Sequence, residues 1–571
     1  MKSHPSLPLD TRHFPPDFTD QLLASYENLD EITDGLLIHS ENWQALNLLQ
    51  EKYRERVKCV YIDPPYNTEK DRADGKFLYK DGYAFSTWLA MIDGRLQVTW
   101  PLLCETGGFY VSIDDTMYAD LFALLASVFG RENHIATVIW EKVHTRKNSA
   151  RHFSVSHDYI PCFARDKNAW DRVLIPRENT DAYSNPDNDP RGAWKADPVY
   201  ANNPYDADYT ITKPNGVVLR RPPGQYWRFS EATWLEFVRR GTVIWGEGNS
   251  YPLVKRYLRD VQDGLVPVTL FKRDFAGDNA AANAEFDALF GSERLFSYPK
   301  PARLIERLCQ TNVRPGAGEI VLDHFAGSGT TGHAVINLNR EDGGRRKFIL
   351  VEMARYFDTV LLPRIKKVTF SPEWKDGKPK RTASQEEFER GPRIVKVIRL
   401  ESYEDALNNL SFDEDGAQIA MQFEDYLLRY LLQWETRKSE TLLNVEKLSK
   451  PFDYCLHIHR DGEIRVQKVD LPETFAYLIG LDVAKRQVLD NDGRRYLVYR
   501  GTTREGKRTA VIWRKTEGWT ENDYRRDRDF VAKHKLAEGA DLIYTNGDSL
   551  IPGAQALDGV FKAKMFTSVE G

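Results

Sequence analysis

The tetrapeptide Asp63-Pro64-Pro65-Tyr66 combines groups that can activate an exocyclic base amine. Such an amine, for example adenine N6, is a poor nucleophile because its lone pair is delocalised into the ring. The Asp63 carboxylate and the Pro64 carbonyl are two acceptors that can hold its two hydrogens out of the ring plane. The prolines have fixed φ and no N–H donor, so the turn is stiff. The Tyr66 ring offers a face on which an extruded base can stack.

An ordinary turn is the alternative interpretation, since proline and aspartate both favour turns. The residues before the tetrapeptide argue against it. Residues 57–62 form a short, mostly apolar run typical of a buried parallel strand. Open α/β sheets bind ligands at the carboxyl ends of such strands. We therefore predict a catalytic turn in which Asp63 orients the amine rather than acting as a strong general base.

A glycine-rich loop follows a second apolar run, residues 319–322. Residues 327–332 have the spacing GxGxxG, and close glycines let a ligand approach the backbone at a helix N-terminus. His333 and Ala334 stand where a phosphate-binding loop needs Lys and Ser or Thr, so an ATPase is poorly supported. Glu352 ends the next predicted strand, where an acid suits the ribose hydroxyls of a nucleoside cofactor.

The glycine loop alone fits either a methyl donor or the nicotinamide cofactor of an oxidoreductase, and the Asp63 turn favours the methyl donor. The predicted cofactor-binding residues are Asp323, Phe325, Ala326, Gly327, Ser328, Gly329, Thr330 and Glu352.

Short apolar runs alternate with helical patterns around both motifs. Strands are predicted at residues 57–62, 108–113, 134–140, 157–163, 319–322 and 347–352, and helices at 42–53, 86–103, 118–129, 300–311 and 331–338. This alternation predicts an α/β fold with an open, doubly wound, mostly parallel, Rossmann-like sheet. The strand ends at Asp63 and Asp323 must then lie side by side.

The alternation is interrupted by a tryptophan-rich segment, which we predict to be an inserted domain at residues 168–290. Residues 213–259 of this segment carry nine Lys or Arg against three acids, with aromatic side chains between them. Basic and aromatic residues together suit phosphate contact and base stacking. A solvated basic face over an aromatic core is the alternative. The predicted DNA-binding residues are Arg220, Arg221, Arg228, Arg239, Arg240, Lys255 and Arg256.

The remaining composition sets limits on function. The 571 residues carry a net charge of −5, and the five cysteines form no CxxC pair, so neither a disulfide framework nor a cysteine zinc site is predicted. His144, His152 and His157 fit no compact metal motif, and no metal site is expected. No run is apolar enough for a membrane span or a signal peptide, so we expect a cytoplasmic protein.

The predicted domains are an N-terminal extension (1–35), a catalytic domain in two parts (36–167 and 291–370) flanking the insert, and a C-terminal α+β domain (387–571). Residues 371–380 are interpreted as a linker or exposed loop. A helix at 418–438 carries an apolar stripe that fits a core better than a partner surface.

The chain resembles the β-class amino-methyltransferases of DNA, and more closely the modification (Mod) subunit of Type III restriction–modification systems. The similarity rests on the order of the Asp63 turn, the inserted segment and the Phe325 loop. It extends to residues 36–38, 108–115, 157–160, 298–301 and 363–367, and to residues 471–475 near the C-terminus. Glu69 departs from the glycine that commonly follows the family's turn.

The resemblance implies a site-specific DNA methyltransferase that uses S-adenosyl-L-methionine to modify adenine N6 in a flipped-out base of double-stranded DNA. Asp63, Pro64, Pro65 and Tyr66 would hold the base. Lys300 and Pro301 would line the cofactor pocket, with Glu352 on the ribose. It also implies a homodimer, a helicase–nuclease restriction subunit as partner, and an insert that acts as the target-recognition domain. Cytosine-N4 methylation and a non-catalytic DNA-recognition subunit are the alternatives.

Overall fold

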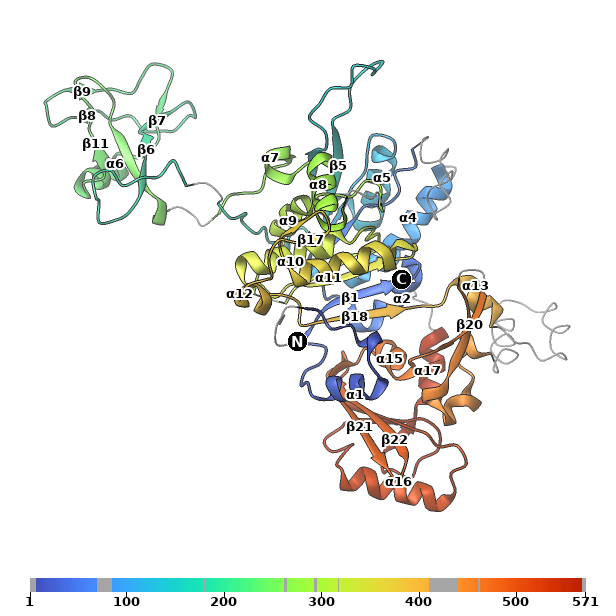
Figure 1. Cartoon of the computed structure of the whole chain (residues 1–571). Coiled ribbons are helices and arrows are strands. Elements are labelled where there is room, and N and C mark those ends of the chain that lie inside the picture. The colour runs from blue at the N-terminus through green and yellow to red at the C-terminus, as the bar shows by residue number, and fades with distance from the viewer. Residues whose placement is uncertain are drawn as a thin grey trace. The chain divides into compact units, whose positions relative to one another are not determined.

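The computed structural model describes residues 7–68, 85–177, 180–260, 264–291, 295–316, 318–409, 439–460 and 463–566 (Figure 1). The chain divides into two compact units, one formed by Met1–Val173 with Val268–Gly571 and the other by Leu174–Pro267. The predicted helix at 418–438 and Glu69 lie outside the described residues. No helix of the described ranges is long and apolar enough to cross a membrane.

A nine-stranded sheet forms the centre of the larger unit in the described part of the chain. Its strands, in order across the sheet, are β13 (Leu270–Phe271), β4 (His134–Glu141), β5 (His157–Ala164), β3 (Leu103–Val111), β2 (Val57–Ile62), β14 (Ile320–Asp323), β15 (Lys347–Glu352), β1 (Thr33–His39) and β18 (Ile394–Arg399). Only β5 runs antiparallel to its neighbours. The mostly parallel sheet predicted from the sequence is therefore confirmed.

Helices cover both faces of this sheet, which is the doubly wound arrangement. One face packs against α2 (Asn42–Tyr53), α4 (Phe85–Thr99) and α5 (Tyr118–Phe129), and the other against α9 (Ala302–Gln310), α10 (Thr330–Asp342) and α11 (Leu362–Phe370). Alternate strand residues supply the two cores: Val60 and Ile62 of β2 point to the first, and Cys59 and Tyr61 to the second. A strand buried on both faces explains why β2 is apolar almost throughout.

The strands that end in the two motifs are neighbours. β2 pairs with β14 in parallel, with Cys59 opposite Val321 and Val60 opposite Leu322. Parallel strands end at the same edge of a sheet, so Asp63 and Asp323 start adjacent loops there. The sequence pattern predicted this juxtaposition across more than 250 residues.

The C-terminal region begins inside the central sheet. β18 pairs in parallel with β1, so the chain after residue 387 first completes the catalytic sheet. Lys396 of β18 then bonds Glu473 of α15 (Leu471–Leu478) at 2.5 Å. Beyond it, a five-stranded sheet forms from β21 (Asp482–Asn491), β22 (Arg494–Thr502), β23 (Arg508–Arg514), β24 (Leu542–Thr545) and β25 (Ala554–Ala556), with α16 (Glu521–Lys533) and α17 (Leu557–Phe566).

The N-terminal extension packs against this C-terminal sheet. Asp20 of α1 (Pro16–Ala24) is buried and accepts hydrogen bonds from Arg486 and Arg495, each at 2.6 Å. The backbone of Leu29 also donates to the carbonyl of Ala484 at 3.0 Å. The two ends of the described chain therefore stabilise each other.

The smaller unit, residues 174–267, has its own core. β6 (Trp194–Pro198), β12 (Leu253–Tyr257) and β11 (Val243–Ile244) form an antiparallel sheet, accompanied by α6 (Glu231–Arg239). Trp227 and Trp234 are buried at its centre. The unit is shorter than the predicted insert at 168–290, because β13 joins the central sheet and Leu289 of α8 (Asn279–Phe290) packs into the larger unit's core.

Candidate active site

Lys300 binds the catalytic turn. Its ammonium donates to both oxygens of the Asp63 carboxylate, at 2.6 and 2.7 Å, and to the Tyr66 hydroxyl at 3.0 Å. The same ammonium lies 5.0 Å from the centre of the Tyr66 ring. The sequence predicted Lys300 to line the cofactor pocket, and the structure places its ammonium on the two residues expected to hold the base.

A second carboxylate fixes Tyr66 from the other side. The Tyr66 hydroxyl donates to Asp158 of β5 at 3.3 Å, and Lys142 donates to the other oxygen of Asp158 at 2.5 Å. Burial raises the pKa of Asp158, although Lys300 and Lys142 oppose that rise. Burial also raises the pKa of Tyr66 well above its ordinary value, so the hydroxyl stays protonated and able to donate.

Asp158 and Lys142 were not among the site residues predicted from the sequence. An aspartate inside the apolar run 157–163 was the available signal, because an acid on a buried strand needs a partner. Its partner Lys142 follows the end of β4, which pairs with β5 and so brings the two side chains together.

The turn itself is anchored by a tryptophan. The buried indole of Trp88, on α4, donates to the Pro65 carbonyl at 2.8 Å. In the described part of the chain no donor reaches the carbonyl of Pro64. Trp88 therefore fixes one carbonyl of the turn and leaves the neighbouring one available as an acceptor.

The glycine loop has a backbone that few residues other than glycine adopt. Gly327 has a φ of +53° and Gly329 a φ of +82°, both in the left-handed region. A Cβ on Gly329 would lie 3.1 Å from the Leu361 side chain. Gly329 also precedes the first residue of α10, so the loop places a helix N-terminus at this edge of the sheet.

Two buried acids brace the loop through its backbone. Asp323 accepts from the Phe325 N–H at 3.0 Å and from the Thr331 hydroxyl at 2.6 Å, and burial raises its pKa to about 7. Glu352 accepts from the N–H groups of Gly327 and Ala354, each at 2.9 Å. Burial raises the pKa of Glu352 as well. Both acids were predicted to contact the cofactor. In the structure each accepts hydrogen bonds from the protein itself.

A buried arginine supports the loop from α11. Arg364 donates to the hydroxyls of Ser328 and Thr330 at 2.8 and 2.9 Å, and pairs with Glu285 of α8. Glu285 also lies 3.2 Å from His333 Nδ1. Two of the predicted loop residues, Ser328 and Thr330, therefore have partners inside the protein that the sequence did not reveal.

The two halves of the site are joined at Lys300. The Thr330 hydroxyl donates to the Lys300 carbonyl at 3.2 Å, while the Lys300 ammonium holds Asp63. Lys300 and Pro301 precede α9, which begins at Ala302 rather than at residue 300 as predicted. Phe325 and Ala326 are largely buried in the loop between β14 and α10. The structure thus brings the turn, the loop and the Lys300 segment into one site.

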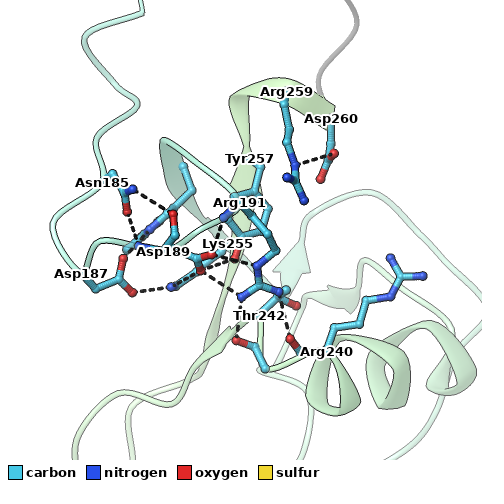
Figure 2. Close-up of polar contacts among 12 residues, drawn as sticks. Asn185, Asp187, Asp189, Arg191, Arg240, Thr242, Lys255, Tyr257, Arg259 and Asp260 are labelled. Carbon is cyan, nitrogen blue, oxygen red and sulfur yellow. Dashed lines mark hydrogen bonds and ion pairs between the residues drawn. The ribbon is translucent and has the colours of Figure 1, made fainter.

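The seven basic residues predicted to contact DNA all lie in the smaller unit, and Lys255 is bound internally. Its ammonium is largely buried, bonds Asp189 at 2.8 Å and pairs with Asp187 (Figure 2). Asp189 also accepts from the Tyr257 hydroxyl at 2.7 Å and from Arg191 at 2.9 Å. These bonds hold the pKa of Asp189 well below its ordinary value, with the Arg191 hydrogen bond the largest cause. Lys255 thus stabilises the unit.

The other six basic residues are more exposed. Arg239 and Arg240 pair with Glu236, Arg228 and Arg256 with Asp197, and Arg221 with Asp208, whereas Arg220 forms no ion pair within the described ranges. Surface pairs of this kind contribute little to stability, so their cations can exchange a carboxylate for a phosphate. DNA contact by these residues remains a prediction.

Comparison with known proteins identifies the family. A family model described as DNA methylase matches residues 57–360, just over half of the chain, and the match includes both motifs. The chain belongs to this DNA methylase family. The match also spans the insert between the two motifs.

Several curated proteins are similar to the chain. The Type III restriction-modification enzyme StyLTI Mod subunit of Salmonella typhimurium is 30% identical over 369 residues, covering 59% of this chain and 54% of that protein. The EcoP15I Mod subunit of Escherichia coli is 27% identical, covering 56% and 58%. The Type II methyltransferase M.KpnI of Klebsiella pneumoniae is 27% identical, covering 58% and 85%. The chain thus spans little more than half the length of the two Mod subunits.

Solved structures of similar description also match. A complex of M1.HpyAVI with SAM is 14% identical, with a TM-score of 0.29, and covers 58% of this chain and 99% of that one. The PvuII cytosine-N4-specific DNA methyltransferase is 13% identical, with a TM-score of 0.31, and covers 59% and 86%.

Proposed function

We propose that this chain is a site-specific DNA methyltransferase that transfers a methyl group from S-adenosylmethionine to adenine N6, as the modification subunit of a Type III-like system. One observation carries the proposal: the Asp63 turn and the Phe325 loop leave neighbouring parallel strands and are joined by Lys300. An amine-activating turn beside a nucleoside-binding loop suits transfer of a group from a cofactor to a base.

The loop residues fit S-adenosylmethionine, which supplies the methyl group when bound. Gly327 and Gly329 keep the loop free of side chains where their φ is positive, so a ligand can approach the backbone. Phe325 and Pro301 would add apolar surface to the cofactor pocket. Glu352 would accept from the ribose hydroxyls in addition to the N–H groups of Gly327 and Ala354.

The turn would activate the amine by accepting its hydrogens. One N6 hydrogen would bond the Asp63 carboxylate and the other the Pro64 carbonyl, which Trp88 holds in place through Pro65. Tyr66 would stack on the base, which must leave the helix to reach the turn. Once N6 carries the methyl group it would have to lose one proton, and the Asp63 oxygen that already holds that hydrogen would accept it as a weak base.

Lys300 would set the direction of the Asp63 carboxylate. By bonding both carboxylate oxygens it fixes the carboxylate plane, and each oxygen keeps a second lone pair for the amine. Lys300 is therefore a positioning residue for Asp63.

The smaller unit would recognise the DNA sequence, and a helicase–nuclease subunit would cut unmodified DNA. The similar proteins named Mod subunits support this assignment. We also propose a homodimer, on the family resemblance. Mass photometry of the purified chain gives its subunit number, and a mass of one subunit would contradict the dimer.

The decisive experiment is to express the chain in a host that lacks DNA methylation and to digest the DNA to nucleosides. N6-methyldeoxyadenosine is expected, and single-molecule sequencing of the same DNA then gives the modified site. If N4-methyldeoxycytidine were found instead, the substrate would be cytosine rather than adenine. An Asp63→Ala variant should leave no modified base, and modification at the parental rate in that variant would refute the mechanism.

The third outcome is DNA without any modified base from the parental chain. Calorimetry would then measure whether the chain binds S-adenosylmethionine. Binding would indicate a non-catalytic recognition subunit, and no binding would indicate a protein that lacks the cofactor site. Binding of NAD in its place would support the oxidoreductase interpretation of the glycine loop.

A further inference from the structure

The loop between β4 and β5, residues 142–156, starts at the active site. Lys142, its first residue, bonds Asp158, which in turn accepts from the Tyr66 hydroxyl. The Lys142 N–H donates to the Ser156 carbonyl at 2.9 Å and closes the base of the loop. Figure 1 shows the loop extending well beyond β5.

The outer part of the loop is ordered by its own hydrogen bonds. The Lys147 N–H donates to the Ser154 hydroxyl at 2.9 Å, and the Ala150 N–H donates to the Lys147 carbonyl at 3.1 Å. Its two branches are thus tied across from residue 147 to residue 154. These hydrogen bonds therefore give the loop a fixed conformation of its own.

The loop is basic, and its charged side chains are exposed. Residues 142–156 include Arg146, Lys147 and Arg151 and contain no acid. These three side chains are exposed, and in the part of the chain that the structure describes none of them forms an ion pair. The basic residues of the smaller unit mostly face carboxylates, so this loop has the less compensated positive charge. Exposed cations without carboxylate partners suit a phosphate backbone.

Phe153 lies among these cations and is 90% exposed. A fully exposed aromatic side chain leaves its burial free energy unused in the isolated protein, although single exposed apolar residues are common. Here the ring is flanked by charge and lies five residues from Asp158. Five residues reach at most about 17 Å, about five base steps along one DNA strand. Phe153 can therefore reach only bases close to the one at Tyr66.

We propose that residues 142–156 form a DNA-contacting arm in which Phe153 enters the base stack beside the extruded adenine. Arg146, Lys147 and Arg151 contact the flanking phosphates. Extruding a base breaks its stacking, and an inserted apolar side chain offsets that loss. The inference rests on the proposed DNA methyltransferase function. It assigns to the catalytic unit a DNA contact separate from the inserted unit.

The test compares two duplexes that carry the modified site. In one the target adenine is paired, and in the other it faces an abasic position, which already weakens its stacking and pairing. Phe153→Ala should methylate the paired duplex about tenfold more slowly than the parent, and the abasic duplex within about twofold of it. Phe153→Trp should keep the parental rate on both. Tyr403→Ala, at a 74% exposed aromatic on α13 (Tyr403–Asn408), is the matched control and should equal the parent.

Equal rates for Phe153→Ala and the parent on the paired duplex would overturn the role of Phe153, as would an equal loss on both duplexes. A parental chain that methylates neither duplex would instead refute the proposed function.

The phosphate contacts are tested by binding alone. Replacing Arg146, Lys147 and Arg151 together by glutamine should reduce the slope of log affinity against log salt by about 2.7, at about 0.9 for each phosphate contact. Fluorescence anisotropy with a labelled duplex measures that slope without any need for methylation. An unchanged slope would overturn the arm.

Discussion

At the scale of single residues, the catalytic turn depends on neighbours that hold its side chains in place. Asp63 and Tyr66 are each bonded by Lys300, and Tyr66 is also bonded by Asp158. On the proposed function, Asp158 and Lys300 are positioning residues, since both would act through the turn. Their loss should affect the rate of transfer more than the binding of the cofactor.

Asp158→Asn tests this distinction. The amide oxygen can still accept from Tyr66, but the neutral side chain no longer pairs with Lys142. The side chain at position 158 should therefore be held less firmly, and the Tyr66 ring should lose its fixed direction. A hydrogen bond to a charged group is worth about 1.5–3 kcal/mol, which corresponds to a fall in kcat of about 10- to 100-fold. The KM for S-adenosylmethionine should stay within about twofold. A rise in that KM with kcat unchanged would place Asp158 in the cofactor site instead.

Asp323 gives the molecule a pH-dependent stability of known sign. Burial raises its pKa from 3.8 to about 7, so folding takes up a proton between these values. The contribution of Asp323 to the free energy of unfolding is therefore complete below about pH 4 and is lost as pH rises through 7.

The Asp323→Asn variant lacks this titration. The Tm of the parent minus that of the variant should fall as pH rises from 5 to 8, measured by calorimetry in buffers of one ionic strength. Glu306, whose pKa burial also raises to about 7, is unchanged in both proteins and cancels in the difference. A difference that is constant or increases with pH would contradict a folded-state pKa of about 7 for Asp323.

At the scale of elements, the glycine loop is limited by its backbone conformation. Gly329→Ala places a Cβ where φ is +82° and 3.1 Å from Leu361, so the loop must shift. A left-handed residue other than glycine costs about 1–2 kcal/mol. We expect a lower Tm and at least a tenfold weaker binding of S-adenosylmethionine by calorimetry.

Gly94→Ala is the matched control for that substitution. Gly94 lies inside α4, and a Cβ at this position would have no neighbouring atom of the described residues within 4 Å. Alanine there should raise the free energy of unfolding by about 0.5–1 kcal/mol and leave cofactor binding unchanged. If both substitutions weakened binding equally, the effect would not come from the loop.

Elements with strong periodicity were predicted well from the sequence. The helices at 42–53 and 118–129 and the strand at 347–352 have the predicted bounds. The helix predicted at 86–103 ends at Thr99, since Pro101 restricts the residue before it. The sequence places β18 in the C-terminal domain, whereas in the structure it is an edge strand of the central sheet. Its partner β1 lies about 360 residues earlier, so no local pattern reveals the pairing.

The contacts within the site were likewise predicted only in part from the sequence. The sequence predicted that Asp63 and the Phe325 loop would meet, because strand order in a parallel sheet brings loop ends together. It did not predict that Lys300 would bond Asp63, 237 residues away, or that Arg364 would hold Ser328. Side-chain partners of this kind depend on packing, which no local pattern in the sequence encodes.

At the scale of the whole molecule, the first and last residues of the inserted unit lie side by side. Ile175 and Leu265 pair in an antiparallel bridge, with backbone hydrogen bonds of 2.9 and 2.8 Å in the two directions. Such a pair brings the two Cα atoms to about 5.5 Å. The chain therefore enters and leaves the unit at almost the same place.

This connection allows the unit to be removed without stretching the rest of the chain. Replacing residues 176–264 by a short glycine–serine linker should preserve the central sheet, because this segment has a hydrophobic core of its own. We expect the shortened protein to unfold cooperatively and to bind S-adenosylmethionine within about threefold of the parent, but to lose methylation at the parental DNA site. If it methylated that same site at the parental rate, sequence recognition would lie in the catalytic unit. If cofactor binding were lost as well, the two units would form one folding unit.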